Sequence, residues 1–143
     1  MTIKGTTYET IIDIERLIIV CEARLELYEL EFKTYTLQRL KVQADETAVK
    51  MNIQENFLNK LKERRDMLYE QIDKLSNDLN DIEYNIFKEK FIYGTSNGDI
   101  QSKLSIEKTC YHKHLNRIID VLQTTPYGEL ITETLKEEWL ITI

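Results

Sequence analysis

Apolar residues recur along the first forty positions of the chain at alternating intervals of three and four. This series is Ile11, Ile14, Ile18, Cys21, Leu25, Tyr28, Phe32 and Tyr35. A second set widens the apolar face: Leu17, Leu27, Leu30, Leu37 and Leu40. The spacing is that of the a and d positions of a coiled coil, and the width favours contact with more than one helix. Thr6 and Glu9 have the spacing of a capping box. We expect this helix to cover residues 7–43.

A similar series follows, out of phase with the first by two residues. It comprises Met51, Leu58, Leu61, Leu68, Ile72, Leu75, Leu79, Ile82 and Ile86, with Gln54 and Arg65 in register. The change of phase indicates a stutter or a chain reversal near residues 42–46, where Asp45 would cap a new helix. We favour two long helices, 7–43 and 46–78, packed antiparallel within the chain, across a dimer interface, or both. Because this turn lacks Gly and Pro, a single very long helix is the alternative.

Helices of this length must bury their apolar stripe to be stable. We therefore expect the protein to form a dimer or higher oligomer, and a self-contained monomeric hairpin is the alternative. The residues expected at the oligomer interface are Ile14, Ile18, Leu25, Tyr28, Phe32, Leu61, Leu68, Ile72 and Leu75.

The last third of the chain contains signals for several short helices. Asn77, Asp78, Asn80 and Asp81 are good capping residues, so a helix over about 82–93 is expected, ended by Gly94 in a left-handed conformation. Ser96 and Asp99 resemble a capping box for a helix over 97–104. After a short connection, residues 105–107, a third helix over 107–122 would turn one apolar face inward. That face consists of Tyr111, Leu115, Ile118, Ile119 and Leu122.

The two latter helices, joined by a tight turn, predict a helix-turn-helix. The face of the third helix opposite its apolar residues is polar, and its residue types suit base edges and phosphates. The expected DNA contacts are Lys108, Thr109, His112, Lys113, Asn116 and Arg117, together with Lys103 on the preceding helix. Residues 101–117 carry a net charge of +3 within a chain of net charge −6. This predicts a localised nucleic-acid footprint with about four phosphate contacts per subunit.

These residues also carry a family resemblance. Residues 90–107, KFIYGTSNGDIQSKLSIE, resemble the sigma-factor region 4 type of helix-turn-helix, with its glycine-ended helix, Ser cap and acid–Ile pair. Residues 110–119, CYHKHLNRII, are similar to the recognition helix of ArpU/RinA-like phage transcriptional regulators. Ser105, Glu107 and Cys110 stand where the pattern has Gly, Ser and Thr. The match covers about residues 80–122.

The resemblance implies an oligomeric, sequence-specific regulator that binds double-stranded DNA. It implies in particular an activator of late or transfer genes of a phage or mobile element in Gram-positive bacteria, with RNA polymerase as a further candidate partner. Two alternatives remain open. The chain could be a coiled-coil interaction protein that does not read DNA, or a phage packaging protein of the small-terminase kind.

The sequence offers no catalytic or cofactor motif. His112 and His114, two positions apart on a helix, cannot chelate one metal, and no Cys-x-x-Cys occurs. No apolar run has the roughly 18 residues of a membrane span. We therefore expect a non-enzymatic protein without metal or cofactor that is cytoplasmic and not in a membrane. The resemblance implies that this cytoplasm is that of a bacterial host.

Together these signals predict an all-α protein in three parts. Residues 1–79 would form the helical oligomerisation region, 80–122 the helix-turn-helix domain and 123–143 an amphipathic terminal helix. Thr125 and Pro126 would start that last helix. Its apolar residues would pack on the N-terminal helices or on a partner subunit: Leu130, Ile131, Leu135, Trp139, Leu140 and Ile143.

Overall fold

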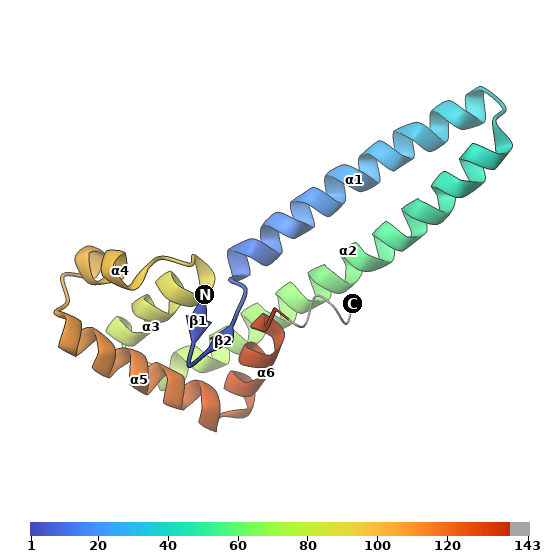
Figure 1. The fold of residues 1–143 in the computed structure, drawn as a ribbon. Helices are drawn as coiled ribbons and strands as arrows, with labels where there is room; N and C mark the ends of the chain where they lie inside the picture. The colour runs from blue at the N-terminus through green and yellow to red at the C-terminus, as the bar shows by residue number, and fades with distance from the viewer. Residues whose placement is uncertain (138–143) are drawn as a thin grey trace. The chain divides into compact units, whose positions relative to one another are not determined.

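The computed structural model of the chain describes residues 1–137 and is mostly helical, as predicted (Figure 1). Its elements in chain order are β1 (Thr2–Ile3), β2 (Thr6–Thr7), α1 (Ile11–Leu37), α2 (Lys41–Leu75), the 3₁₀ turn η1 (Ser76–Asp78), α3 (Asp81–Phe87), the π-helical segment η2 (Lys88–Ile92), α4 (Asn97–Leu104), α5 (Lys108–Thr124) and α6 (Pro126–Leu135). The residues Trp139, Leu140 and Ile143 of the predicted terminal helix lie outside the described residues.

The chain divides into two units, which we describe separately. One is the helical hairpin Glu15–Glu63, and the other combines Met1–Ile14 with the chain from Arg64 onward. The predicted boundary between residues 79 and 80 coincides with neither limit of the hairpin.

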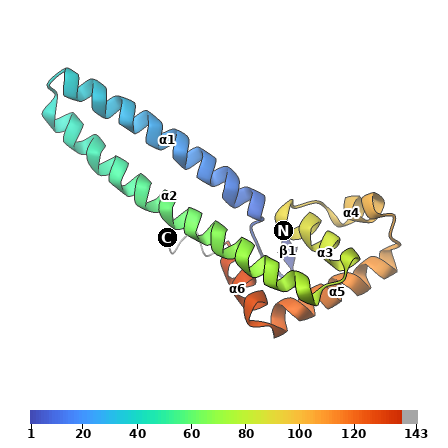
Figure 2. The ribbon, with the colours of Figure 1, turned by 180° about the vertical axis from the view of Figure 1, so that it is seen from behind.

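In the hairpin unit, α1 and α2 run side by side in opposite directions (Figures 1 and 2). The inner residues of the predicted series make its core, with Ile18, Cys21, Leu58 and Leu61 buried. Burial raises the pKa of the Cys21 thiol. The predicted pair of antiparallel helices is therefore confirmed, and the alternative of a single very long helix is excluded.

The reversal between α1 and α2 lies earlier than predicted. It occupies residues 38–40, so the expected turn at 42–46 was wrong, and Asp45 is an exposed residue inside α2. The chain turns at Arg39, whose φ of +60° is left-handed, and the Leu40 amide then donates to the Tyr35 carbonyl at 2.9 Å. This is the C-cap geometry that glycine usually provides. Because a non-glycine residue adopts it here, no residue type in the sequence marks the position of this turn.

The start of α1 also differs from the prediction. Thr6 belongs to β2, which pairs antiparallel with β1 around the turn at Lys4 and Gly5. The helix is capped by Thr10, whose hydroxyl accepts from the Asp13 amide at 3.3 Å while the Asp13 carboxylate accepts from the Thr10 amide at 3.1 Å. The reciprocal cap expected of Thr6 and Glu9 is thus made four residues later.

The short helices agree more closely with the prediction. The helix expected over 82–93 is α3 continued by η2, and Gly94 ends it with a φ of +74°. The bounds predicted for α4 are those observed, and α5 extends two residues beyond the expected end. At α6, the Thr125 hydroxyl accepts from the Gly128 amide at 3.2 Å, with Pro126 in the first turn, as predicted.

The second unit encloses its own apolar core. Phe87 and Phe91 stack with ring centroids 4.9 Å apart, and Ile100 from α4 is fully buried. The predicted apolar face of α5 is confirmed, because all five of its residues are buried: Tyr111, Leu115, Ile118, Ile119 and Leu122. None of the described helices is both long enough and apolar enough to cross a membrane.

The residues predicted for an oligomer interface lie within the chain's own packing. Six of them are at most 2% exposed, namely Ile14, Ile18, Leu61, Leu68, Ile72 and Leu75. The other three, Leu25, Tyr28 and Phe32, are partly buried. A second copy could not reach the six buried side chains while this fold is kept, so a contact between copies has to use other residues.

Candidate nucleic-acid interface

The helices α3, α4 and α5 cluster in the second unit, with a tight turn between the last two (Figure 1). The Ser96 hydroxyl caps α4 by accepting from the Asp99 amide at 3.3 Å. The helix ends at Ser105, which is left-handed (φ +53°), and the Ile106 amide closes the turn onto the Gln101 carbonyl at 3.0 Å. Three residues therefore separate α4 from α5, which is the connection length of a helix-turn-helix.

The first turn of α5 has a weak cap. Glu107 occupies the N-cap position with extended backbone, but its side chain accepts no hydrogen bond from the helix. The first amides of α5 therefore lack a side-chain acceptor at this position, and a negative charge lies beside the positive end of the helix dipole.

Five of the seven predicted DNA-contacting residues form one exposed surface, which we call the α5 outer face. It consists of Lys108, Thr109, His112, Lys113 and Asn116. The His112 ring lies edge-on to the Tyr111 ring, with centroids 5.4 Å apart. Within the described residues, the ammonium groups of Lys108 and Lys113 form no ion pair. This face therefore presents two uncompensated cations and several donors and acceptors to solvent.

Arg117, the sixth predicted contact, is held against α3. Its Nε donates to Glu83 Oε2 at 3.1 Å and its Nη2 donates to the Asp78 carbonyl at 3.1 Å. Glu83 is only 1% exposed, and its other oxygen accepts from the Asn80 amide in a capping box that starts α3. The side chain of Arg117 is 53% exposed. It thus compensates a buried carboxylate and keeps only part of its surface for another ligand.

Lys103, the seventh predicted contact, is also paired. Its Nζ lies 2.6 Å from Glu89 Oε1, while Glu89 Oε2 accepts from the Thr95 hydroxyl at 2.8 Å. The hydrogen bond from Lys103, and then that from Thr95, holds the pKa of Glu89 below its usual range. Of the four cations expected to meet phosphates, two are therefore neutralised within the chain.

A polar junction inside the unit joins η2, α4 and α5. The Oδ1 atom of Asn97 accepts from Lys90 Nζ at 2.8 Å and from the Tyr111 hydroxyl at 2.6 Å. Lys90 is 8% exposed, and burial lowers the pKa of its ammonium and raises that of the Tyr111 phenol. One amide oxygen thus satisfies two buried donors and fixes the spacing of α4 and α5.

Sequence reasoning missed Glu83, Glu89 and Asn97. For Glu83 a local signal existed, since Asn80 and Glu83 have capping-box spacing. Its ion pair with Arg117 spans 34 positions, and no local pattern indicates it.

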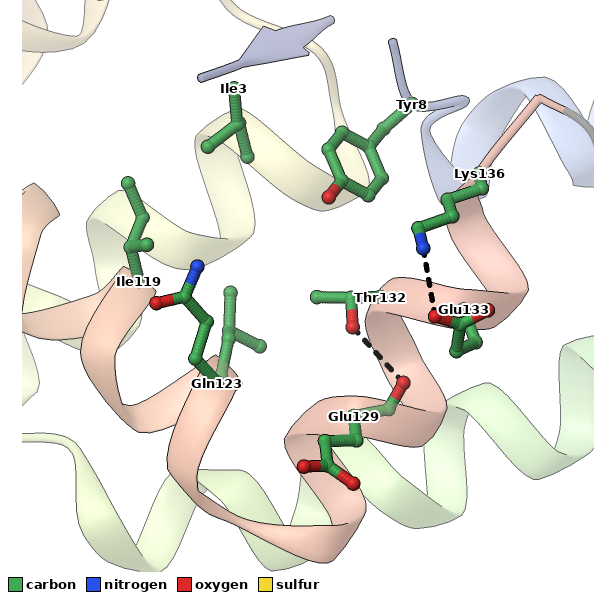
Figure 3. A pocket seen from close by; sticks show the side chains of 9 residues that line it. Ile3, Tyr8, Ile119, Gln123, Glu129, Thr132, Glu133 and Lys136 are labelled. Carbon is green, nitrogen blue, oxygen red and sulfur yellow. Dashed lines mark hydrogen bonds and ion pairs between the residues drawn. The ribbon is translucent and has the colours of Figure 1, made fainter. Parts of the chain in front are cut away.

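A separate cavity of about 350 Å³ lies between the N-terminal strands, the end of α5 and α6 (Figure 3). The ion pair of Lys136 with Glu133 (2.8 Å) and the hydrogen bond from the Thr132 hydroxyl to the Glu129 carbonyl (3.0 Å) line it. Among residues 1–137, no group of three or more His, Cys, Asp and Glu side chains could hold a metal ion. The expectation of a non-enzymatic protein stays a prediction.

Comparison of the chain with protein-family models, curated proteins and solved structures finds no match. The resemblance to ArpU/RinA-like regulators therefore depends on the pattern of residues 80–122 alone.

Proposed function

We propose that the protein is a regulator that binds double-stranded DNA through the α5 outer face, placed in the major groove. The resemblance of residues 80–122 to ArpU/RinA-like regulators supports a role in the transcription of phage or mobile-element genes in Gram-positive bacteria. The setting and the direction of regulation come from that resemblance.

The observation that carries the proposal is the division of α5 into two faces. One face is buried against the rest of the unit, with none of its five apolar residues more than 8% exposed, and the opposite face is exposed and free of acidic side chains from Lys108 to Asn116. An exposed helix of this kind after a three-residue turn is the reading element of helix-turn-helix proteins.

The residue types on this face divide by role. Lys108 and Lys113 supply positive charge for phosphates, whereas Asn116 can pair with the donor and acceptor of adenine. Thr109 and His112 offer additional hydrogen-bonding groups toward base edges. The pairing of Lys103 and Arg117 reduces the expected phosphate contacts from four to two per subunit, so the slope of log affinity against log salt should be near −1.8 per subunit.

The deciding experiment is a selection of bound sequences from a random DNA pool, followed by titration of the selected probe with wild type and Lys108→Ala/Lys113→Ala. We expect the double variant to bind at least about 10-fold more weakly at low salt and to lose most of the salt dependence, because both uncompensated cations are removed.

A matched control is Lys50→Ala/Lys60→Ala, which removes the same charge from exposed positions of the hairpin. It should bind like wild type. Equal binding by both double variants would refute the assignment of the α5 outer face, and the absence of any selected sequence would refute the proposed function.

A second candidate function is a protein–protein interaction module that does not read DNA. It is favoured by the neutralisation of Lys103 and Arg117 by Glu89 and Glu83, which leaves little positive potential on a chain of net charge −6. Failure to shift any DNA probe at low salt would support this candidate.

A further inference from the structure

The side of α1 that faces away from α2 carries a second, mostly apolar series that no charged residue interrupts. Its members are Val20, Ala23, Leu27, Leu30, Thr34 and Leu37, spaced alternately by three and four. We call this surface the outer face of α1. It lies wholly within the hairpin unit.

This outer face is exposed, although its composition is that of a buried one. Val20 is 44% exposed, and Leu27, Leu30 and Leu37 are 60–78% exposed. The Thr34 hydroxyl donates to the Leu30 carbonyl at 2.9 Å, so the backbone satisfies it and only its methyl group remains for contacts. A strict a/d series on a helix that already has a buried seam indicates a second helical neighbour.

The corresponding side of α2 is a poorer docking surface. Val42, Val49 and Ile53 are also exposed there, but Glu46 and Lys60 occupy the same stripe. Charged residues within a seam are costly to bury. The series on α1, which contains no charged residue, is therefore the better candidate for a contact.

The series on α1 is complementary to itself when two copies run antiparallel. Residue 20 then lies opposite 37, residue 23 opposite 34 and residue 27 opposite 30, so every layer of the seam is filled. The twofold axis passes between Tyr28 and Glu29.

The charges beside the seam agree with this arrangement. On one side Arg24 meets Glu31 of the second copy, and on the other Glu26 meets Lys33, which makes four attractive pairs in the dimer. A parallel pair would instead place Glu26 beside Glu31 of the other copy, which is repulsive. Within residues 1–137, these four charged side chains form no ion pair of their own.

We propose that the outer face of α1 docks against the same face of a second copy of this chain, with the two helices antiparallel. This deepens the proposed function by naming its oligomer contact, but it does not depend on DNA binding. The face spans about 27 Å at roughly 1.5 Å per residue. A contact of this size belongs to the small, transient class, so we expect a dissociation constant of roughly 1–100 µM.

Sedimentation equilibrium of the full chain without DNA tests the contact. Wild type should pass from monomer to dimer with concentration, whereas Leu30→Glu should weaken the dimer by more than about 100-fold, because it places unpaired carboxylates in the central layers. The control Val49→Glu changes an equally exposed apolar residue on α2, and should dimerise like wild type. Circular dichroism should show both variants folded, since both positions are exposed.

Exchange of charges tests the orientation. Glu26→Lys and Lys33→Glu should each weaken the dimer roughly 5- to 50-fold, and the double variant Glu26→Lys/Lys33→Glu should restore it. In a parallel dimer Glu26→Lys would strengthen association, because it would meet Glu31. Stronger association of Glu26→Lys would therefore overturn the proposal. So would a wild type that stays monomeric up to roughly 0.5 mM, or loss of the dimer in Val49→Glu but not in Leu30→Glu. None of these outcomes depends on whether the chain binds DNA.

Discussion

Ser105 and Glu107, in the turn that leads into α5, are both unfavourable for the positions they occupy. Ser105 adopts a left-handed conformation, in which a side chain with a Cβ is disfavoured by about 1–2 kcal/mol relative to the right-handed one. Glu107 occupies an N-cap position without supplying a capping acceptor. Both residues depart from the helix-turn-helix consensus, yet the turn has the expected shape. The shape is therefore set by the packing of α4 and α5, with Ile100 and Tyr111 fully buried, and not by the turn residues alone.

Replacing Glu107 with serine should stabilise the fold. A serine hydroxyl can accept from an amide in the first turn of α5, which stabilises by about 0.5–2 kcal/mol, while loss of the favourable charge–dipole contact offsets about 0.3–1 kcal/mol. We expect a net gain of about 0.5–1 kcal/mol in the free energy of unfolding, measured by urea denaturation. Glu107→Ala is the control, since it removes the charge without adding a cap. Equal stability of the two variants would contradict the capping explanation.

The helices α3 and α5 are held together by polar contacts as well as by apolar packing. Arg117 links the buried Glu83 carboxylate to the Asp78 carbonyl, so one α5 side chain compensates the start of α3 and the end of η1. Lys113, four residues earlier on α5, is exposed and has no such partner within the described residues. Two basic residues on one helix thus have different roles, although the sequence predicted that both would contact DNA.

The two roles predict different stabilities for Arg117→Ala and Lys113→Ala. Removing Arg117 leaves a buried carboxylate with less compensation, so the free energy of unfolding should fall by about 1–3 kcal/mol. Removing Lys113 should change it by less than about 0.5 kcal/mol. Thermal and urea denaturation at neutral pH measure both. If the two variants were equally stable, the pair between Arg117 and Glu83 would not support the fold, and Arg117 would have to be considered chiefly as a DNA contact.

Helix ends could be predicted wherever a short-range signal marks them. Gly94, Ser96 and the Thr125–Pro126 pair cap their helices by contacts within a few residues, and all were found from the sequence. Arg39 ends α1 in the left-handed conformation, which its residue type does not favour. The sequence therefore did not indicate this turn, and the predicted hairpin turn lay about four residues too late. The reciprocal cap of Thr10 and Asp13 has a recognisable spacing, but the similar spacing of Thr6 and Glu9 drew the prediction to the wrong site.

Across the molecule, the sequence predicted how many charged and apolar residues each region contains, but not which partners those residues contact. The sequence gives residues 101–117 a net charge of +3, but carboxylates from η2 and α3 neutralise two of its cations. The heptad residues assigned to a contact between copies are largely buried within one chain, which leaves the second series on α1 exposed. Both outcomes depend on contacts between residues distant in sequence, which a linear pattern cannot assign.

The two proposals together predict how binding depends on the number of DNA sites. A dimer joined through α1 carries two α5 outer faces, so a probe with two half-sites should be bound more tightly than a probe with one, by an avidity factor of about 10- to 100-fold. Leu30→Glu should lose that factor and still bind the single half-site like wild type, because the α5 outer face is unchanged. Fluorescence anisotropy with both probes measures the two affinities, and Val49→Glu is the matched control. If Leu30→Glu weakened binding to the single half-site by the same factor, the substitution would have disturbed the DNA-binding unit itself. If wild type did not distinguish the probes, the two faces would not act together, whatever their separate affinities.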